Sequence, residues 1–175
     1  MKVQTIRASQ FILRPFKKGD ESSLAKNLNN KKIIKNLLLI PSPYTLKDAK
    51  EWVDKNLKEY KKEKPSMFNF VIDVDGEVVG SIGVRNITEH HMAEIGYWLS
   101  ESYWGKGIMA EAVKLITVFG FKELRLKRMY AFTYPSNIAS QKTLLKNGYV
   151  FEGILKKHAY KNKKFLDDYL YANVK

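Results

Sequence analysis

The sequence contains no cysteine among its 175 residues. This absence excludes disulfide bonds, a cysteine nucleophile and cysteine-ligated metal sites, and it suits a reducing compartment. Histidine is also scarce: the chain has three, and the adjacent pair His90-His91 has no third ligand at a metal-binding spacing. We therefore expect no bound metal, and we interpret the histidine pair as part of a surface turn.

Long apolar runs are missing as well. The longest, at residues 33–40, is interrupted by Lys35 and Asn36 and is followed by Pro41. It is too short for a transmembrane helix, and the N-terminal residues lack the apolar core of a signal peptide. The sequence therefore predicts a cytoplasmic protein that does not bind a membrane.

Acidic residues are outnumbered, with 31 Lys and Arg against 18 Asp and Glu and a formal net charge of +13. Arginine is rare among the basic residues, although nucleic-acid-binding proteins favour arginine for its forked contacts to phosphates and bases. We therefore interpret most lysines as solvated surface. Electrostatic steering leaves an acidic partner, an RNA or the ribosome open as an alternative.

The length fits one domain, residues 1–175, and no repeat or low-complexity linker divides it. Apolar spacings predict strands near residues 11–16, 68–74, 78–83, 92–99, 128–134, 149–155 and 165–174, and helices near 20–28, 45–60, 107–119 and 137–147. Asp75-Gly76 predicts a hairpin. Helix caps are predicted at Asp20, at Thr45 with Asp48, and at Asn137 or Ser136. This order of about seven strands and about four helices predicts an α+β fold, an α/β sandwich.

The segment Gly105-Lys106-Gly107 separates the predicted strand at 92–99 from the helix that follows it. Two closely spaced glycines let the backbone turn sharply and expose successive N–H groups. The helix N-terminus adds further unpaired N–H groups and a partial positive charge. This combination predicts a phosphate-binding cradle.

The cradle alone does not identify its ligand. A Walker loop is excluded because its Gly-Lys-Ser/Thr is missing, whereas Gly105, Gly107 and Ala110 satisfy the dinucleotide pattern G-x-G-x-x-A. That pattern requires an acidic residue about twenty positions on, where Lys127 stands, and a second half-domain for which the remaining chain is too short. The alternative is that the glycines only end a strand and start a helix.

Five short motifs extend this segment in a fixed order: Tyr97-Trp98-Leu99, Tyr103-Trp104-Gly105-Lys106-Gly107, Ala110-Glu111-Ala112, Asn137-Ile138-Ala139-Ser140 and Lys146-Asn147-Gly148-Tyr149. Together they resemble the GCN5-related N-acetyltransferases (GNAT), and more narrowly the branch with the ribosomal-protein N-terminal acetyltransferases RimJ and RimL. The resemblance begins at Ser9 and reaches the final strand. It implies the GNAT fold, with a mixed and mostly antiparallel sheet.

The resemblance also implies acetyl-CoA as the cosubstrate, without a metal. The backbone of Trp98 and Leu99 would bond to the pantetheine arm like an added strand. The remaining implied contacts are the amides of Gly105, Lys106, Gly107, Met109 and Ala110 for the pyrophosphate, Asn137 and Ser140 for the pantetheine arm, and Lys146 for a phosphate. Met109 departs from the small residue that is usual in the family, and Lys146 has the alternative of a solvated helix end.

The catalytic residues are less well defined by the resemblance. Glu94 on the strand beside the site is a candidate general base acting through water, with an outward-facing strand carboxylate as the alternative. Ser140 matches the serine proposed as the general acid in RimL. The RimL base aligns with Ala159 here, and the tyrosine acid of other acetyltransferases aligns with Leu144. His158, next to Ala159, is a further candidate base or an ordinary surface histidine.

We therefore hypothesise an acetyl-CoA-dependent N-acetyltransferase that acts on the N-terminal amine of a protein or peptide, such as a ribosomal protein. An α-amine, with a pKa of about 8, is far more often neutral than a lysine side chain, so it demands less of a base. The resemblance implies that residues 30–45 are the specificity region, because the corresponding helices and their connection form part of the acceptor site in that family. A polyamine or aminoglycoside acetyltransferase, a non-catalytic acetyl-CoA-binding regulator, ribosome association and a homodimer stay open.

Overall fold

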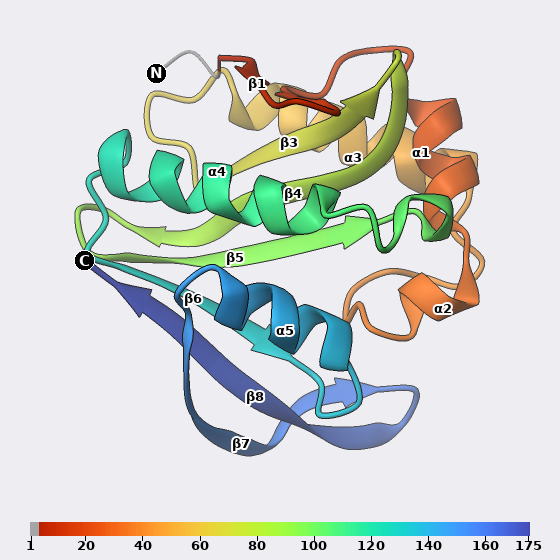
Figure 1. Cartoon of the computed structure of the whole chain (residues 1–175). Coiled ribbons are helices and arrows are strands. Elements are labelled where there is room, and N and C mark those ends of the chain that lie inside the picture. The colour runs from red at the N-terminus through yellow and green to blue at the C-terminus, as the bar shows by residue number, and fades with distance from the viewer. Residues whose placement is uncertain (1–3) are drawn as a thin grey trace.

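The structure, a computed structural model, describes residues 4–175 (Figure 1). Eight strands form one sheet in the order β1-β2-β3-β4-β5-β6-β8-β7. The strands are β1 (Ile6–Arg7), β2 (Ile12–Arg14), β3 (Met67–Val74), β4 (Glu77–Thr88), β5 (Met92–Leu99), β6 (Arg128–Thr133), β7 (Val150–Lys161) and β8 (Lys164–Val174). The helices are α1 (Glu21–Leu28), α2 (Lys31–Ile34), α3 (Leu46–Glu59), α4 (Ile108–Lys122) and α5 (Ile138–Lys146), with a 3₁₀ turn η1 (Glu101–Tyr103).

The predicted α+β fold class is confirmed, and the structure adds two short elements, β1 and α2. Each is too short to show an apolar period, since β1 has 2 residues and α2 has 4. The Asn30 side chain caps α2 by accepting a hydrogen bond from the Lys32 amide at 2.8 Å. Within residues 4–175, no helix combines the length and the apolar composition needed to span a bilayer.

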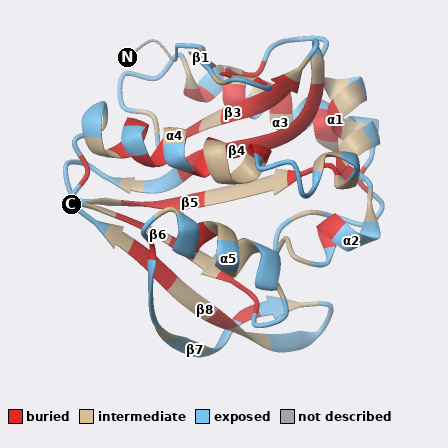
Figure 2. Cartoon of the chain, in the orientation of Figure 1, coloured by how far each residue is buried: buried red, intermediate tan, exposed pale blue. Residues whose placement is uncertain are grey.

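Helices cover both faces of the sheet. In Figure 1, α4 and α5 lie in front of it, α3 lies behind β3 and β4, and α1 lies at the right beside the ends of these two strands. The core is divided accordingly: Phe70, Ile116 and Met129 belong to the cluster beneath α4, and Leu24 and Val53 belong to the cluster beneath α1 and α3. Figure 2 shows the contrast between the buried central strands and β7, most of whose residues are exposed.

The predicted turns and caps are mostly confirmed. Asp75 and Gly76 join β3 to β4 with φ angles of 51° and 89°, the left-handed pair that a tight hairpin requires. At the start of α3 the Asp48 amide donates to Thr45 Oγ1 at 3.3 Å, and the Thr45 amide donates to Asp48 Oδ2 at 2.7 Å. This reciprocal arrangement is a capping box, with aspartate in place of glutamate.

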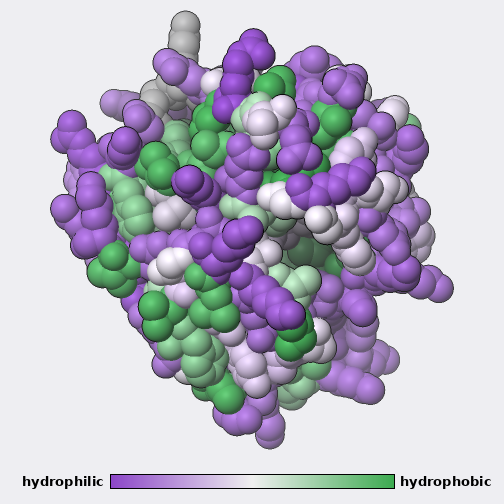
Figure 3. All heavy atoms as spheres, viewed as in Figure 1, coloured by the Kyte–Doolittle hydropathy of each residue, from purple (hydrophilic) through white to green (hydrophobic). Residues whose placement is uncertain are grey.

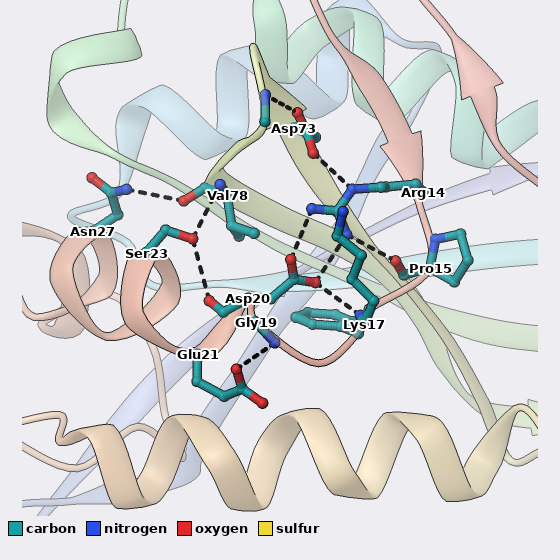
Figure 4. A network of polar contacts seen from close by, with 12 residues as sticks. Arg14, Pro15, Lys17, Gly19, Asp20, Glu21, Ser23, Asn27, Asp73 and Val78 are labelled. Atoms are coloured by element: carbon teal, nitrogen blue, oxygen red, sulfur yellow. Dashed lines mark hydrogen bonds and ion pairs between the residues drawn. The ribbon is translucent and has the colours of Figure 1, made fainter.

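A buried charge network joins β2, α1 and β3 (Figure 4). Arg14 Nε donates to Asp73 Oδ2 at 2.7 Å, and Arg14 Nη1 and Nη2 donate to the two carboxylate oxygens of Asp20 at 2.9 and 2.8 Å. The three residues are between 3% and 8% exposed. The guanidinium therefore fixes the position of α1 against the N-terminal strands.

The network corrects the prediction that Asp20 caps α1. The helix does begin directly after Asp20, but the Asp20 side chain makes no capping hydrogen bond. Its oxygens accept instead from Arg14 and from the Lys17 amide, the latter at 2.8 Å. A charge-assisted bond to a guanidinium is stronger than a bond to a helix amide, so Arg14 determines the orientation of the carboxylate.

We expect Arg14→Met to lower the free energy of unfolding by about 3–5 kcal/mol, because it leaves two buried carboxylates without their partner. Urea denaturation measures this loss. Lys18→Met is the matched control, since Lys18 pairs with Asp54 on the exposed surface and its loss should leave the urea midpoint unchanged. Equal losses in both variants would show that the Arg14 network does not stabilise the fold.

Candidate functional site

The sheet opens between β5 and β6. Among residues 4–175 these neighbours form the one parallel pair of strands, and they are paired only from Met92 to Glu94 with Arg128 to Tyr130. Beyond Glu94, β5 continues to Leu99 while β6 diverges. The space-filling view in the orientation of Figure 1 shows a hollow near the end of β5 and the start of α5 (Figure 3). An extended ligand can therefore enter between two strands of the same sheet.

The end of β5 presents backbone groups to this opening. Antiparallel pairs alternate between hydrogen-bonded and non-bonded residues, and the Ser100 amide donates to the Val79 carbonyl at 2.8 Å. By this alternation the Trp98 amide faces β4, whereas the Leu99 amide faces the opening. The Leu99 carbonyl accepts a hydrogen bond from the Trp104 indole at 2.8 Å. The Leu99 amide is thus the group placed to bond to an entering strand-like ligand.

The predicted cradle has the geometry for an anion. Gly105 and Gly107 adopt left-handed φ angles of 77° and 78°, and a Cβ at either position would meet nothing within 4 Å. Gly107 is the N-cap of α4 and provides no capping side chain. The first three amides of α4, at residues 108–110, have no hydrogen-bond partner among the described residues, because the Glu111 amide is the first to reach the Gly107 carbonyl.

Met109 does not obstruct the cradle. Its side chain packs against the core cluster beneath α4, so only its backbone amide belongs to the cradle. Lys106 contributes a positive charge beside the cradle, with its ammonium 4.8 Å from the centre of the Tyr103 ring. Lys146 is the exposed last residue of α5. Figure 1 shows α4 and α5 starting on the same side, so Lys146 lies at the end of α5 away from the cradle.

Asn137 and Ser140 stand at the start of α5, across the opening from β5. The Asn137 side chain caps the helix by accepting from the Ser140 amide at 3.3 Å. The Ser140 hydroxyl lies 2.8 Å from the hydroxyl of Tyr97 on β5. Burial raises the pKa of Tyr97, so this phenol stays protonated. The Tyr97–Ser140 pair links β5 to α5 across the opening and places two hydrogen-bonded hydroxyl groups there.

Glu94 occupies the last paired position at the base of the opening. It is 6% exposed, and Arg85 and Asn86 donate to its two oxygens at 2.5 and 2.9 Å. Tyr130 stands opposite it on β6. Because both oxygens already accept hydrogen bonds within the sheet, this arrangement favours a structural role for Glu94 over proton transfer.

A second polar group lies where β6, β7 and β8 meet. His158 Nδ1 is 2.8 Å from Asp168 Oδ2, and the His158 ring lies 4.8 Å from the Phe132 ring. Asp168 is 5% exposed and Tyr134, the residue after β6, is 8% exposed. The Tyr134 hydroxyl has no hydrogen-bond partner among the described residues. Burial, followed by the charge of Asp168, raises the pKa of Tyr134.

Sequence reasoning named His158 but missed Asp168 and Tyr134. The register of β7 against β8 shifts between Leu155 and Ala159. This irregularity brings His158 into contact with Asp168, ten positions later in the chain. No short-range pattern encodes such a bulge. The one signal in the sequence was the placement of Tyr134 between the end of a strand and the Asn137 cap.

The hairpin of β7 and β8 also contacts the short helix α2. The Lys161 ammonium donates to the carbonyls of Ile34 and Leu37, both at 2.5 Å. Burial lowers the pKa of Lys161. The predicted specificity region, residues 30–45, is thereby tied to the strands that carry His158 and Asp168.

Across residues 4–175, no group of three or more His, Asp or Glu side chains is arranged to hold a metal ion.

Comparisons with known proteins agree on one family. The acetyltransferase (GNAT) domain family matches residues 10–150. The uncharacterized N-acetyltransferase YnaD of Bacillus subtilis is 30% identical over 168 residues, which cover 95% of each chain. The ribosomal-protein-serine acetyltransferase of Escherichia coli is 30% identical over 128 residues, covering 73% of this chain and 70% of its own.

A solved structure, that of Mycobacterium smegmatis RimJ in complex with CoA-disulfide, has a TM-score of 0.86 to this chain. It is 25% identical in sequence, and the match covers 98% of this chain and 86% of that one. The expected fold is therefore confirmed along nearly the whole chain.

The burial of the Tyr97 phenol should make the stability of the protein depend on pH in the alkaline range. A buried phenol with a raised pKa ionises later than in the unfolded chain, so its stabilising effect is fully present below about pH 10 and is lost above it. In Tyr97→Phe we expect unfolding free energy to fall less steeply above pH 10, by up to about 1.4 kcal/mol per pH unit. Denaturant titrations at several pH values measure the slope. Identical slopes would mean that Tyr97 is not buried as described.

Proposed function

Because this chain belongs to the acetyltransferase (GNAT) family and is an N-acetyltransferase, we propose that its acceptor is the N-terminal α-amine of a protein or peptide. The observation that supports acetyl-CoA as the donor in this reaction is the juxtaposition at the opening of the sheet. Unpaired amides at residues 108–110, the free Leu99 amide and the Tyr97–Ser140 pair all border the same opening. This juxtaposition fits the diphosphate, the amide-containing arm and the thioester of acetyl-CoA, in that order.

Different groups of the protein bind different parts of acetyl-CoA. The amides from Gly105 to Ala110 bind the diphosphate, with the α4 dipole and the Lys106 ammonium supplying positive charge. The Leu99 amide donates to a carbonyl of the pantetheine arm, as in strand addition. The Asn137 side-chain NH₂, which has no hydrogen-bond partner among the described residues, is available to a second carbonyl of that arm. Lys146 is better placed for solvent than for a phosphate.

Direct transfer needs few protein groups. The neutral amine attacks the thioester carbonyl, and the C–S bond breaks. The sulfur takes the proton of the Ser140 hydroxyl, which Ser140 regains from the attacking nitrogen, with Tyr97 orienting that hydroxyl. The thiolate is a good leaving group, so this acid assists the reaction without being essential. An α-amine, with a pKa of about 8, meets the requirement for neutrality more easily than a lysine at about 10.4.

The choice of a protein N-terminus has further support. The Escherichia coli relative is named for acetylating a serine of a ribosomal protein, and a solved neighbour is RimJ. The net charge of +13 is compatible with encounter at the ribosome, a strongly anionic surface on which new N-termini appear. We accordingly place the protein in the cytoplasm.

Coupled release of CoA tests the acceptor. Peptides with varied first residues, each with its N-terminally blocked counterpart, are mixed with acetyl-CoA and a thiol-reactive dye. The protein has no cysteine, so the dye reports only released CoA. We expect release with free peptides and none with blocked peptides that keep an internal lysine. Release with spermidine or an aminoglycoside alone would instead identify a small-amine acetyltransferase, and tight acetyl-CoA binding without release would identify a regulator.

Ser140→Ala should lower kcat about tenfold, at the low end for a general acid, because thiolate departure needs little assistance. The KM for acetyl-CoA should change by less than about twofold, since backbone amides carry most of the binding. Thr143→Ala is the matched control, because Thr143 lies on the same helix and donates to the Ala139 carbonyl within it. Steady-state kinetics at saturating peptide measures both. Equal rates in parent and Ser140→Ala would remove Ser140 from the mechanism.

A further inference from the structure

We propose that Tyr134, Asp168 and His158 form the subsite that receives the acceptor's ammonium group, with His158 as the base that takes its proton. The proposal rests on the proposed function and names residues for the acceptor half of the reaction. It is carried by a buried carboxylate, an accessible imidazole and a buried hydroxyl without a partner, gathered beside the opening between β5 and β6. An ammonium ion is the chemical group that such a set recognises.

The Tyr134 hydroxyl points to a ligand. A buried hydroxyl without a hydrogen bond costs on the order of 1–3 kcal/mol, and proteins seldom retain one without a reason. Tyr134 directly follows β6, one wall of the opening, and lies three residues before the Asn137 cap of α5. A bound amine would donate a hydrogen bond to this oxygen and remove the deficit.

The His158–Asp168 pair has the geometry of a base with an orienting carboxylate. Because Nδ1 faces Asp168 at 2.8 Å, the proton of the neutral ring belongs on Nδ1, which leaves Nε2 as the acceptor. The Phe132 ring supports one face of the imidazole. The imidazole side chain is 45% exposed, whereas the carboxylate of Asp168 is 7% exposed. His158 can therefore exchange a proton with solvent, whereas the Asp168 carboxylate is shielded from water.

The other charges around His158 are accounted for. On β7, the Lys156 ammonium donates to Asp167 at 2.9 Å, and the Lys157 amide donates to the same carboxylate at 2.8 Å. The charge of Asp167, on β8, is thus neutralised by Lys156 from the adjacent strand. From β8 the carboxylate on His158 is Asp168, and from β6 the nearby ionisable group is Tyr134. The electrostatic environment of the base is dominated by one buried carboxylate.

The subsite lies on the correct side of the sheet. Met129 and Ala131 of β6 face the core beneath α4, so the alternate residues Tyr130 and Phe132 face the opposite side. His158 contacts Phe132 and therefore lies on that opposite side. The cradle belongs to α4, on the first side. An amine approaching from the His158 side meets a thioester held from the other side, as direct attack requires.

The proton balance is simple. The acceptor arrives as R–NH₃⁺, binds against Asp168 and Tyr134, and gives one proton to His158 Nε2, forming an imidazolium paired with Asp168. The freed lone pair forms the C–N bond, and the electrons of the broken C–S bond leave on sulfur. The second amine proton ends on that sulfur through Ser140, and the first passes from His158 to water.

His158→Gln, Asp168→Asn and Tyr134→Phe test the subsite with the α-amine peptide that turns over best. We expect His158→Gln to lower kcat/KM about 100-fold and to abolish the fall of the parent's rate on the acid side, because an imidazole accepts a proton only when neutral. Asp168 is a positioning residue, so Asp168→Asn should keep the fall in rate at acid pH but move the pH at which it occurs. Tyr134→Phe should raise the peptide KM about tenfold and leave kcat within about twofold.

His90→Gln is the matched control, because His90 is an exposed histidine in the turn between β4 and β5. Calorimetric titration with acetyl-CoA should give the same Kd for all variants. If the parent turns over and His158→Gln matches it in rate and pH profile, the subsite is wrong and the proposed function stands. If the parent releases no CoA with any amine, the proposed function fails. In that case peptide binding in the presence of CoA tests the subsite separately. The subsite is supported only if Asp168→Asn abolishes peptide binding.

Discussion

The early end of pairing between β5 and β6 is the constraint on which the site depends. Three residue pairs hold the two strands together, and their separation beyond Glu94 creates the opening. The bonds from Arg85 and Asn86 to Glu94 fix its base, and the Tyr97–Ser140 contact spans it. A sheet paired along its whole length would bury the backbone groups that a thioester arm must reach.

The opening separates the two halves of the proposed reaction. One half consists of backbone donors at the start of α4, which suit an anion without specific side chains and so tolerate Met109. The other half depends on side chains from β6, β7 and β8, where Asp168 and Tyr134 are buried within a strongly basic protein. A buried carboxylate keeps its attraction for a cation despite the surrounding lysines, because solvent screens exposed charges far more than buried ones.

Local chemistry explains the features that were predictable. The hairpin at Asp75-Gly76, the capping box at Thr45 and the cradle at Gly105 each depend on residues within about four positions of one another. The error at Asp20 and the late recognition of Asp168 have a different cause. Asp20 bonds to Arg14, a β2 residue six positions earlier, because the loop after β2 folds back on that strand. Asp168 meets His158 because the register of β7 against β8 shifts between Leu155 and Ala159.

The sequence alone determined the order of elements, the α+β class, the cradle and the resemblance to GNAT enzymes, because periodicity, turns and motifs are properties of contiguous residues. Tertiary structure decided the orientation of the Leu99 amide, the hydrogen bonds that occupy both oxygens of Glu94, the placement of Lys146 away from the cradle, and the meeting of Tyr134, Asp168 and His158. The reason is that strand divergence and a shift in register act across the sheet. No pattern along the chain records which side chains they bring together.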